Sequence, residues 1–264
     1  MDLQLNGKKA LVTGSTAGIG FAVAQALAAE GASVVINGRT EKRVDAAIRE
    51  IQKVYPAATL SGAAADVSNA AGCAKLTQAV GSVDILVNNM GIFEPKPFEK
   101  IPDEDWIRFF EANVMSGVRL SRHYLAGMRR KNWGRIIFIS SESAVQISAE
   151  MIHYAMTKTA QVAVARGIAE TVAGTGITVN SVLVGPTRSE GVETYIAQFS
   201  AQSGTDAAAF EKEFFKNVRP SSLLKRFASA DEVANMIVYL SSPLASATNG
   251  AAVRADGGVI RAIL

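Results

Sequence analysis

A phenol and an amine stand four residues apart in the stretch Tyr154-Ala155-Met156-Thr157-Lys158. In a helix this spacing places both side chains on one face. A phenol with the ordinary pKa of about 10 is a poor base near neutrality, but a nearby cation favours the phenolate and lowers that pKa. Such a pair could pass a proton to or from a substrate oxygen while a hydride moves to or from a cofactor. Because the pair also occurs by chance in many helices, it needs supporting features.

Ser141 and Asn113 are further candidates for the same chemistry. The apolar strand predicted over 135–139 runs into Ser140-Ser141, and the carboxyl end of a strand is where an α/β protein builds its site. From there Ser141 could donate a hydrogen bond to a substrate carbonyl. Asn113 lies inside a long helical stretch, 103–130, where asparagine has low propensity and needs a reason. The alternative for Asn113 is an exposed position on that helix.

Glu142 follows Ser141 directly, and a carboxylate is unusual at this position. A carboxylate there could select a cationic or hydroxyl-rich substrate. Because carboxylates are rarely buried, we favour an outward-facing surface position for Glu142.

A glycine-rich turn, Thr13 to Gly20, follows the first predicted strand and opens the first predicted helix. Its glycines, Gly14, Gly18 and Gly20, allow a tight turn whose amides approach a pyrophosphate at the helix N-terminus. Any tight strand–helix turn can use glycine, so a bare structural turn is the alternative. The order of strand, turn, helix and second strand favours dinucleotide binding.

The end of the second predicted strand bears on the choice of dinucleotide. A site for NAD is expected to place an Asp or Glu there to accept from the ribose 2′-OH. No carboxylate occurs before Glu41, and Arg39 stands where a guanidinium could meet a 2′-phosphate. We therefore expect NADP(H) to be favoured over NAD(H); the alternative is that Arg39 is a solvated loop charge.

Apolar, β-branched runs alternate with helical patterns along the chain and would position these groups. Candidate strands cover 10–12, 33–36, 60–64, 85–87, 135–139, 177–183 and 251–254. They are continuously apolar, as in a parallel sheet covered on both faces. Their alternation with helices predicts an α/β fold of three layers, doubly wound around a mostly parallel sheet of about seven strands.

One segment, at about 188–225, interrupts this alternation. It carries two amphipathic pieces, which contain Val192, Tyr195, Ile196 and Phe199, then Phe210, Phe214 and Val218. An excursion of this length at the carboxyl ends of strands is often a lid over the site. We favour a substrate lid over the alternative, an extra pair of core helices.

The composition excludes several classes of protein. The chain of 264 residues carries a net charge of +3 with its basic residues scattered, unlike a nucleic-acid binder. The single cysteine, Cys73, excludes an internal disulfide framework and fits a reducing compartment. No signal peptide or membrane span is recognised, and no linker divides the chain. We expect one cytoplasmic domain, 1–264, that binds neither nucleic acid nor membrane.

Together these residues resemble the short-chain dehydrogenase/reductase family, and the resemblance runs from about Gly7 to Gly258. Each motif is weak alone, but all of them in order are strong. The motifs that carry it are Thr13 to Gly20, Asp66-Val67, Asn88 to Gly91, Asn113, Ser141, Tyr154, Lys158, Asn180-Ser181-Val182, Gly185-Pro186-Thr187, Asn249-Gly250 and Asp256-Gly257-Gly258.

The resemblance implies a Rossmann fold and a role for each matching position. Tyr154 would be the general acid/base, Lys158 would depress its pKa and hold the nicotinamide ribose, Ser141 would orient the substrate oxygen, and Asn113 would order a water linking Lys158 to solvent. The implied cofactor-binding residues are Gly14, Ser15, Thr16, Gly18, Ile19, Gly20, Arg39, Asp66, Val67, Asn88, Gly91, Tyr154, Lys158, Gly185 and Thr187. The expected substrate-binding residues are Ser141, Gln146, Tyr154 and Tyr195. No metal is needed, since hydride transfer uses a positioned cofactor.

The implied activity is an NAD(P)(H)-dependent oxidoreductase that interconverts a carbonyl and a secondary alcohol on a small molecule. The alternatives are a 3-oxoacyl-carrier-protein reductase and a non-catalytic dinucleotide-binding regulator. Met90 and Val184, which depart from the family's usual Ala and Pro, give the regulator some support. The family also implies a homo-oligomer, a tetramer or dimer.

Overall fold

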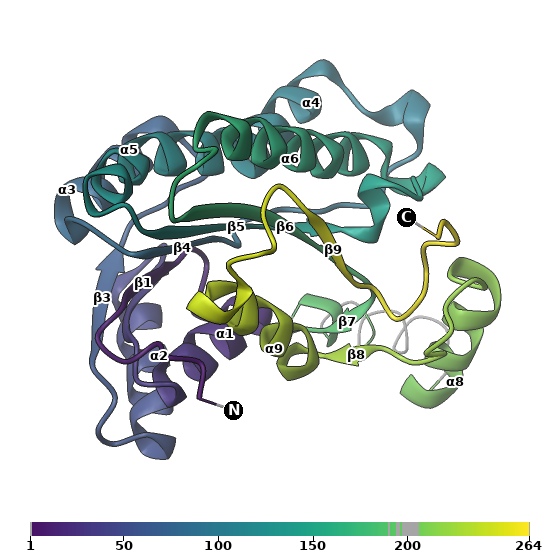
Figure 1. The fold of residues 1–264 in the computed structure, drawn as a ribbon. Coiled ribbons are helices and arrows are strands. Elements are labelled where there is room, and N and C mark those ends of the chain that lie inside the picture. The colour runs from purple at the N-terminus through teal and green to yellow at the C-terminus, as the bar shows by residue number, and fades with distance from the viewer. Residues whose placement is uncertain (1, 190, 194–195, 197–205, 264) are drawn as a thin grey trace.

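The computed structural model describes residues 2–189, 191–193, 196 and 206–263. Its centre is a parallel sheet of seven strands in the order β3-β2-β1-β4-β5-β6-β9 (Figure 1). The strands are β1 (Lys9–Val12), β2 (Ser33–Gly38), β3 (Leu60–Ala64), β4 (Ile85–Asn88), β5 (Gly134–Ser141), β6 (Ile177–Val184) and β9 (Ala252–Ala255). Each coincides with a strand predicted from an apolar run, so the predicted α/β fold is confirmed.

Helices cover both faces of this sheet (Figure 1). One layer contains α1 (Gly18–Ala29), α2 (Glu41–Val54) and α9 (Ala230–Ser241); the other contains α3 (Ala70–Val80), α5 (Ser116–Lys131) and α6 (Ile152–Thr171). On β1, Ala10 and Val12 pack into the first layer and Leu11 into the second. Successive strand side chains point to opposite faces, so both must be apolar, which explains the continuous apolar runs.

The order of the strands reverses between β1 and β4. From β1 the chain builds outward through β2 and β3, then returns to place β4 on the other side of β1. Ligands of open α/β sheets bind outside the carboxyl ends of the strands at such a switch point. The glycine-rich turn follows β1 there, and Asn88 to Gly91 follow β4.

The long helix predicted over 103–130 contains an irregularity. It consists of α4 (Asp103–Phe110), a π-helical turn (Glu111–Met115) and α5. Single π-helical turns recur at functional sites. Here the turn contains Asn113, which is fully buried. The alternative of an exposed position for Asn113 on this helix is therefore wrong.

The segment after β6 makes a small core of its own. It includes β7 (Thr187–Arg188), α8 (Ala207–Glu213), a π-helical turn (Phe214–Val218) and β8 (Ala228–Ser229), which pairs with β7. Ile196, Phe210, Phe215 and Phe227 form its buried cluster, whereas Val218 is 45% exposed. Tyr195 and Phe199 lie outside the described residues. None of the helices in the described part of the chain is long and apolar enough to cross a membrane.

Candidate active site

The glycine-rich turn after β1 is shaped to receive a dinucleotide. Gly14 and Gly18 have φ of +61° and +57°, which L side chains rarely adopt. A Cβ on Gly20 would meet Asn89 Nδ2 and lie 2.5 Å from the carbonyl oxygen of Gly14. Helix α1 begins at Gly18 without a side-chain cap or an acidic residue in its first turn. Its first amides therefore suit an anion such as a pyrophosphate.

A pocket of about 230 Å³ lies at this turn, lined by Ala17, Gly18, Ile19, Gly20, Asn89, Phe93, Ser189 and Gly191. Asn89 Nδ2 donates to the carbonyl oxygens of Thr13 and Gly14 at 2.9 and 3.1 Å. The predicted residue Asn88 instead turns its amide toward Ser121 of α5, at 3.2 Å. Of these two neighbouring asparagines, Asn89 and not Asn88 lines the pocket.

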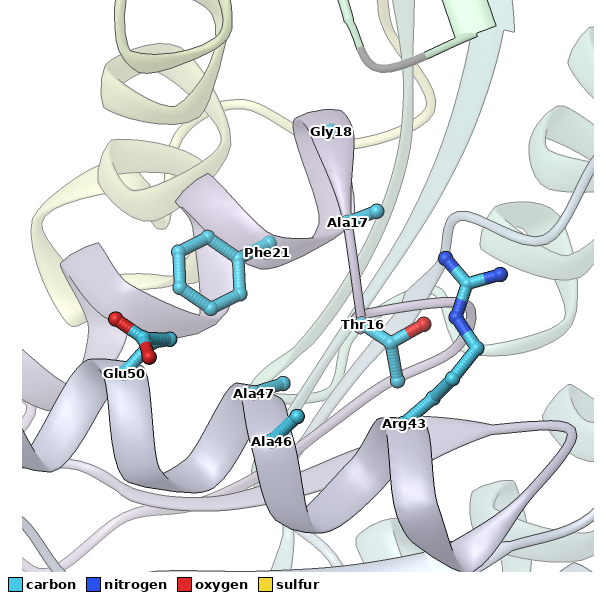
Figure 2. Close-up of a pocket in the computed structure, with 8 residues that line it drawn as sticks. All are labelled: Thr16, Ala17, Gly18, Phe21, Arg43, Ala46, Ala47 and Glu50. Atoms are coloured by element: carbon cyan, nitrogen blue, oxygen red, sulfur yellow. The ribbon is translucent and has the colours of Figure 1, made fainter.

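A second pocket, of about 370 Å³, lies between the glycine-rich turn and α2 (Figure 2). Thr16, Ala17 and Gly18 line it from one side, and Arg43 lines it from the first turn of α2. Figure 2 shows the Arg43 guanidinium extending beside Thr16. Arg39 lies exposed just beyond β2. Arg43 is an addition to the predicted site, and its position four residues after Arg39 was the signal available in the sequence.

The remaining predicted cofactor residues lie at the carboxyl ends of other strands. Asp66 follows β3, where its Oδ1 accepts from the amide of Ser68 at 3.1 Å. The adjacent Val67 is buried. Thr187 follows β6, and its hydroxyl donates to the carbonyl of Gly185 at 2.9 Å. A Cβ on Gly185 would lie 2.7 Å from Asp256 Cα, so only glycine fits there.

Asn113 and Lys158 are joined through Gln161, a residue that the sequence analysis missed. Lys158 Nζ donates to Gln161 Oε1 at 3.1 Å, and Gln161 Nε2 donates to the carbonyl oxygen of Asn113 at 2.6 Å. The Asn113 side chain bonds both backbone groups of Ile92 and the hydroxyl of Thr157. Asn113 therefore fixes the loop after β4 to α6. Asn113 and Lys158 are thus connected by hydrogen bonds between protein groups, through Gln161.

Lys158 is buried in this arrangement, with 4% of its surface exposed. Its Nζ also donates to the carbonyl of Ile139 on β5 at 2.8 Å. Burial lowers the pKa of Lys158 from its usual 10.5 to about 7, because an ammonium loses hydration in the interior. A Cβ on Gly91 would lie 3.4 Å from Nζ, so glycine keeps open the space beside the amine.

Tyr154 lies one helical turn from Lys158 on α6, with Nζ 5.5 Å from its ring centroid. Burial raises the pKa of Tyr154, and the charge of Glu142 raises it further; a hydrogen bond with Ser141 and the charge of Arg219 act in the opposite direction. The expectation that Lys158 lowers this pKa is not met here. The pKa of Tyr154 falls only if further positive charge or hydrogen-bond donors reach its oxygen.

The Ser141 side chain lies between Tyr154 and Glu142. Its hydroxyl donates to Glu142 Oε2 at 2.5 Å and accepts from the amide of Ser143 at 3.1 Å. Glu142 is only 5% exposed, so the favoured prediction of an outward-facing carboxylate is wrong. The strand continues into a short 3₁₀ turn (Glu142–Ala144), which directs Glu142 inward.

The segment after β6 reaches this carboxylate through Arg219. Arg219 Nε donates to Glu142 Oε1 at 3.0 Å. The predicted substrate residue Gln146 contacts the same segment, since its Nε2 donates to Ser221 at 3.2 Å. The structure thus brings Asn113, Ser141, Tyr154 and Lys158 together and adds Glu142 and Arg219. Within the described residues no three His, Cys, Asp or Glu side chains gather as a metal site would require.

Comparisons with known proteins show the family to which this chain belongs. The sequence matches the family described as enoyl-(acyl carrier protein) reductase over residues 14–260. It is 50% identical over 263 residues to the uncharacterized oxidoreductase YvaG of Bacillus subtilis (strain 168), with 100% of both chains covered. It is 34% identical over 258 residues to a D-beta-hydroxybutyrate dehydrogenase of Cupriavidus necator, covering 96% of this chain and 98% of the relative.

The structure of the chain is also similar to solved structures. L-sorbose reductase from Gluconobacter frateurii, complexed with NADPH and L-sorbose, superimposes with a TM-score of 0.93 at 31% identity, with 100% of both chains covered. The chain belongs to the short-chain dehydrogenase/reductase family. It is an NAD(P)-dependent oxidoreductase acting on CH–OH and C=O groups.

Proposed function

We propose that this chain interconverts a small-molecule carbonyl and a secondary alcohol, with NADP(H) as the preferred cofactor. The observation that carries the proposal is the meeting of Ser141, Tyr154 and Lys158 beside a glycine cradle at the switch point of the sheet. The L-sorbose reductase neighbour, described with NADPH and a ketose, supports both the chemistry and the cofactor.

In the reductive direction Tyr154 protonates the substrate oxygen, and in the oxidative direction it accepts the alcohol proton. The nicotinamide dinucleotide, when bound, supplies or takes up the hydride. Ser141 orients the substrate oxygen. The ammonium form of Lys158 would hold the nicotinamide ribose. Gln161 keeps the Lys158 amine connected to Asn113.

The glycine-rich turn would hold the pyrophosphate on the amides of α1, between Gly14 and Gly20. Asp66 and Val67 would line the adenine end, and Thr187 the nicotinamide end. Arg39 and Arg43 would pair with a 2′-phosphate, because Arg43 lines the pocket beside Thr16 and two guanidiniums match a dianion. The segment at about 188–225 would cover the substrate, and Gln146 and Tyr195 would be among the residues that contact the substrate.

The test follows NADPH oxidation across a panel of carbonyl compounds, including acyl-carrier-protein substrates. Tyr154→Phe keeps the ring but removes the proton, and we expect at least about a hundredfold loss of kcat. Equal rates for wild type and variant would remove Tyr154 from the mechanism. Tight NADPH binding without turnover of any carbonyl would favour the non-catalytic regulator.

The cofactor preference has a separate test. Arg39→Ala and Arg43→Ala should each lower the ratio of kcat/KM for NADPH over that for NADH by about tenfold or more, since each removes a charge-assisted hydrogen bond. Unchanged ratios would contradict the preference. One domain over 1–264, a homo-oligomeric assembly and a cytoplasmic location stay predictions from the sequence.

A further inference from the structure

Glu142 is a buried carboxylate that contacts Ser141, the residue proposed to orient the substrate oxygen. Its Oε2 lies 2.5 Å from the hydroxyl of Ser141, and its charge raises the pKa of Tyr154. A negative charge beside a phenol opposes ionisation of that phenol. The proposed acid/base chemistry therefore does not explain why a carboxylate stands here.

Arg219 fixes the position of this carboxylate. Its Nε donates to Glu142 Oε1 at 3.0 Å, its Nη2 to Ser148 Oγ at 2.6 Å and its Nη1 to Glu150 Oε1 at 3.3 Å. Arg219 is itself 7% exposed. Because the guanidinium engages Oε1, the carboxylate is oriented with Oε2 directed at Ser141. Its charge is already compensated, so Oε2 suits a neutral donor better than a substrate ammonium.

The bond to Glu142 also occupies the only proton of Ser141. A serine hydroxyl has one donor hydrogen and two acceptor lone pairs. The hydrogen points to Glu142, while one lone pair accepts from the amide of Ser143. A ketone oxygen is an acceptor alone, so a plain ketone must compete with a carboxylate for that hydrogen.

From these contacts, and resting on the proposed function, we infer that Glu142 recognises a hydroxyl group on the carbon next to the reacting carbonyl. The substrate hydroxyl donates to Glu142 Oε2 in place of Ser141, and the released Ser141 hydrogen then turns to the carbonyl oxygen. The substrate class is accordingly α-hydroxy ketones and, in the oxidative direction, vicinal diols. Glu142 is a specificity-determining residue, and Arg219 is its positioning residue.

The experiment compares 1-hydroxy-2-butanone with 2-butanone, which differ by the one hydroxyl, as substrates for NADPH oxidation. Wild type should favour the hydroxy ketone by about tenfold or more in kcat/KM, as expected when a polar site is built to bond a substrate hydroxyl. In Glu142→Gln the amide oxygen can still accept from Arg219, and the amide nitrogen donates to Ser141, which frees the serine hydrogen. This variant should keep less than a threefold preference for the hydroxy ketone over 2-butanone.

Glu150→Gln is the matched control. Glu150 also pairs with Arg219, but its side chain is 45% exposed and does not bond Ser141. This variant should keep the wild-type preference. If Glu142→Gln fails to fold, Ser141→Ala in the otherwise unaltered chain gives the same information: it should slow the hydroxy ketone by about tenfold more than 2-butanone.

The outcomes separate the inference from the proposed function. Reduction of 2-butanone by wild type without preference for the hydroxy ketone overturns the inference and leaves the proposed function standing. A preference for the hydroxy ketone that survives in Glu142→Gln also overturns the inference. Equal losses of kcat/KM on both ketones, in Glu142→Gln or in Ser141→Ala, overturn it as well, because a merely structural role would affect both substrates. Absence of any carbonyl reduction by wild type refutes the proposed function and the inference with it.

Discussion

Replacing Lys158 by methionine tests the physical state of the buried amine directly. Burial lowers the pKa of Lys158 from 10.5 to about 7, whereas in the unfolded chain the amine keeps its ordinary value. Between these two pH values the unfolded state binds one more proton than the folded state. The free energy of unfolding of wild type must therefore rise with pH in this window, by about 1.4 kcal/mol per unit.

The whole shift of about 3.5 pH units corresponds to about 5 kcal/mol. From pH 7 to pH 9 the gain of wild type is about 2.3 kcal/mol, which is less than two full pH units would give because the amine is half titrated at pH 7. Lys158→Met lacks this titration. Its stability relative to wild type should thus be highest at pH 7 or below and should fall by that amount at pH 9. Loss of the hydrogen bonds to Ile139 and Gln161 adds an offset that does not depend on pH.

Urea unfolding of both proteins at pH 7, 8 and 9 measures the difference. The control is Lys75→Met, which removes an exposed lysine on α3 and should leave the pH dependence of wild type unchanged. A stability difference between Lys158→Met and wild type that stays constant within about 0.5 kcal/mol over this range would refute the buried, pKa-shifted amine.

Three further substitutions test other parts of the structure. Gly20→Ala places a Cβ against Asn89 and the Gly14 carbonyl, so NADPH affinity by fluorescence titration should fall by tenfold or more; Gly167→Ala, in open space on α6, should leave affinity unchanged and stabilise by about 0.5–1 kcal/mol. Burial lowers the pKa of His153, so stability should fall as the pH drops below about 6.5, where the unfolded chain binds the proton first; His153→Leu should flatten this loss in thermal melts, and parallel curves would contradict it. Ser229→Ala removes one half of the capping box of α9 and should cost about 1 kcal/mol in urea unfolding, whereas no loss would show that the cap is not needed.

The local patterns of the sequence were sufficient for the fold. Continuous apolar runs at 33–36 and 177–183 predict strands buried on both faces, and both lie in the parallel sheet as β2 and β6. Hydrophobic burial is set by side-chain type and local period, so it can be read from short windows. The glycine-rich turn is equally local, because the positive φ of Gly14 and Gly18 is a property of single residues.

Burial, charge pairing and proton placement in the site were decided by contacts between distant residues. From the sequence Glu142 is expected to be a solvated carboxylate, but Arg219, seventy-seven positions away, compensates its charge and so makes its burial tolerable. Gln161 joins Lys158 to Asn113 across forty-eight positions. Asn89 lines the pocket and bonds the first turn, whereas Asn88 bonds Ser121. The same is true of the Tyr154 pKa: the spacing to Lys158 follows from the helix, but its direction of shift depends on the solvent and charges that the folded chain removes or supplies.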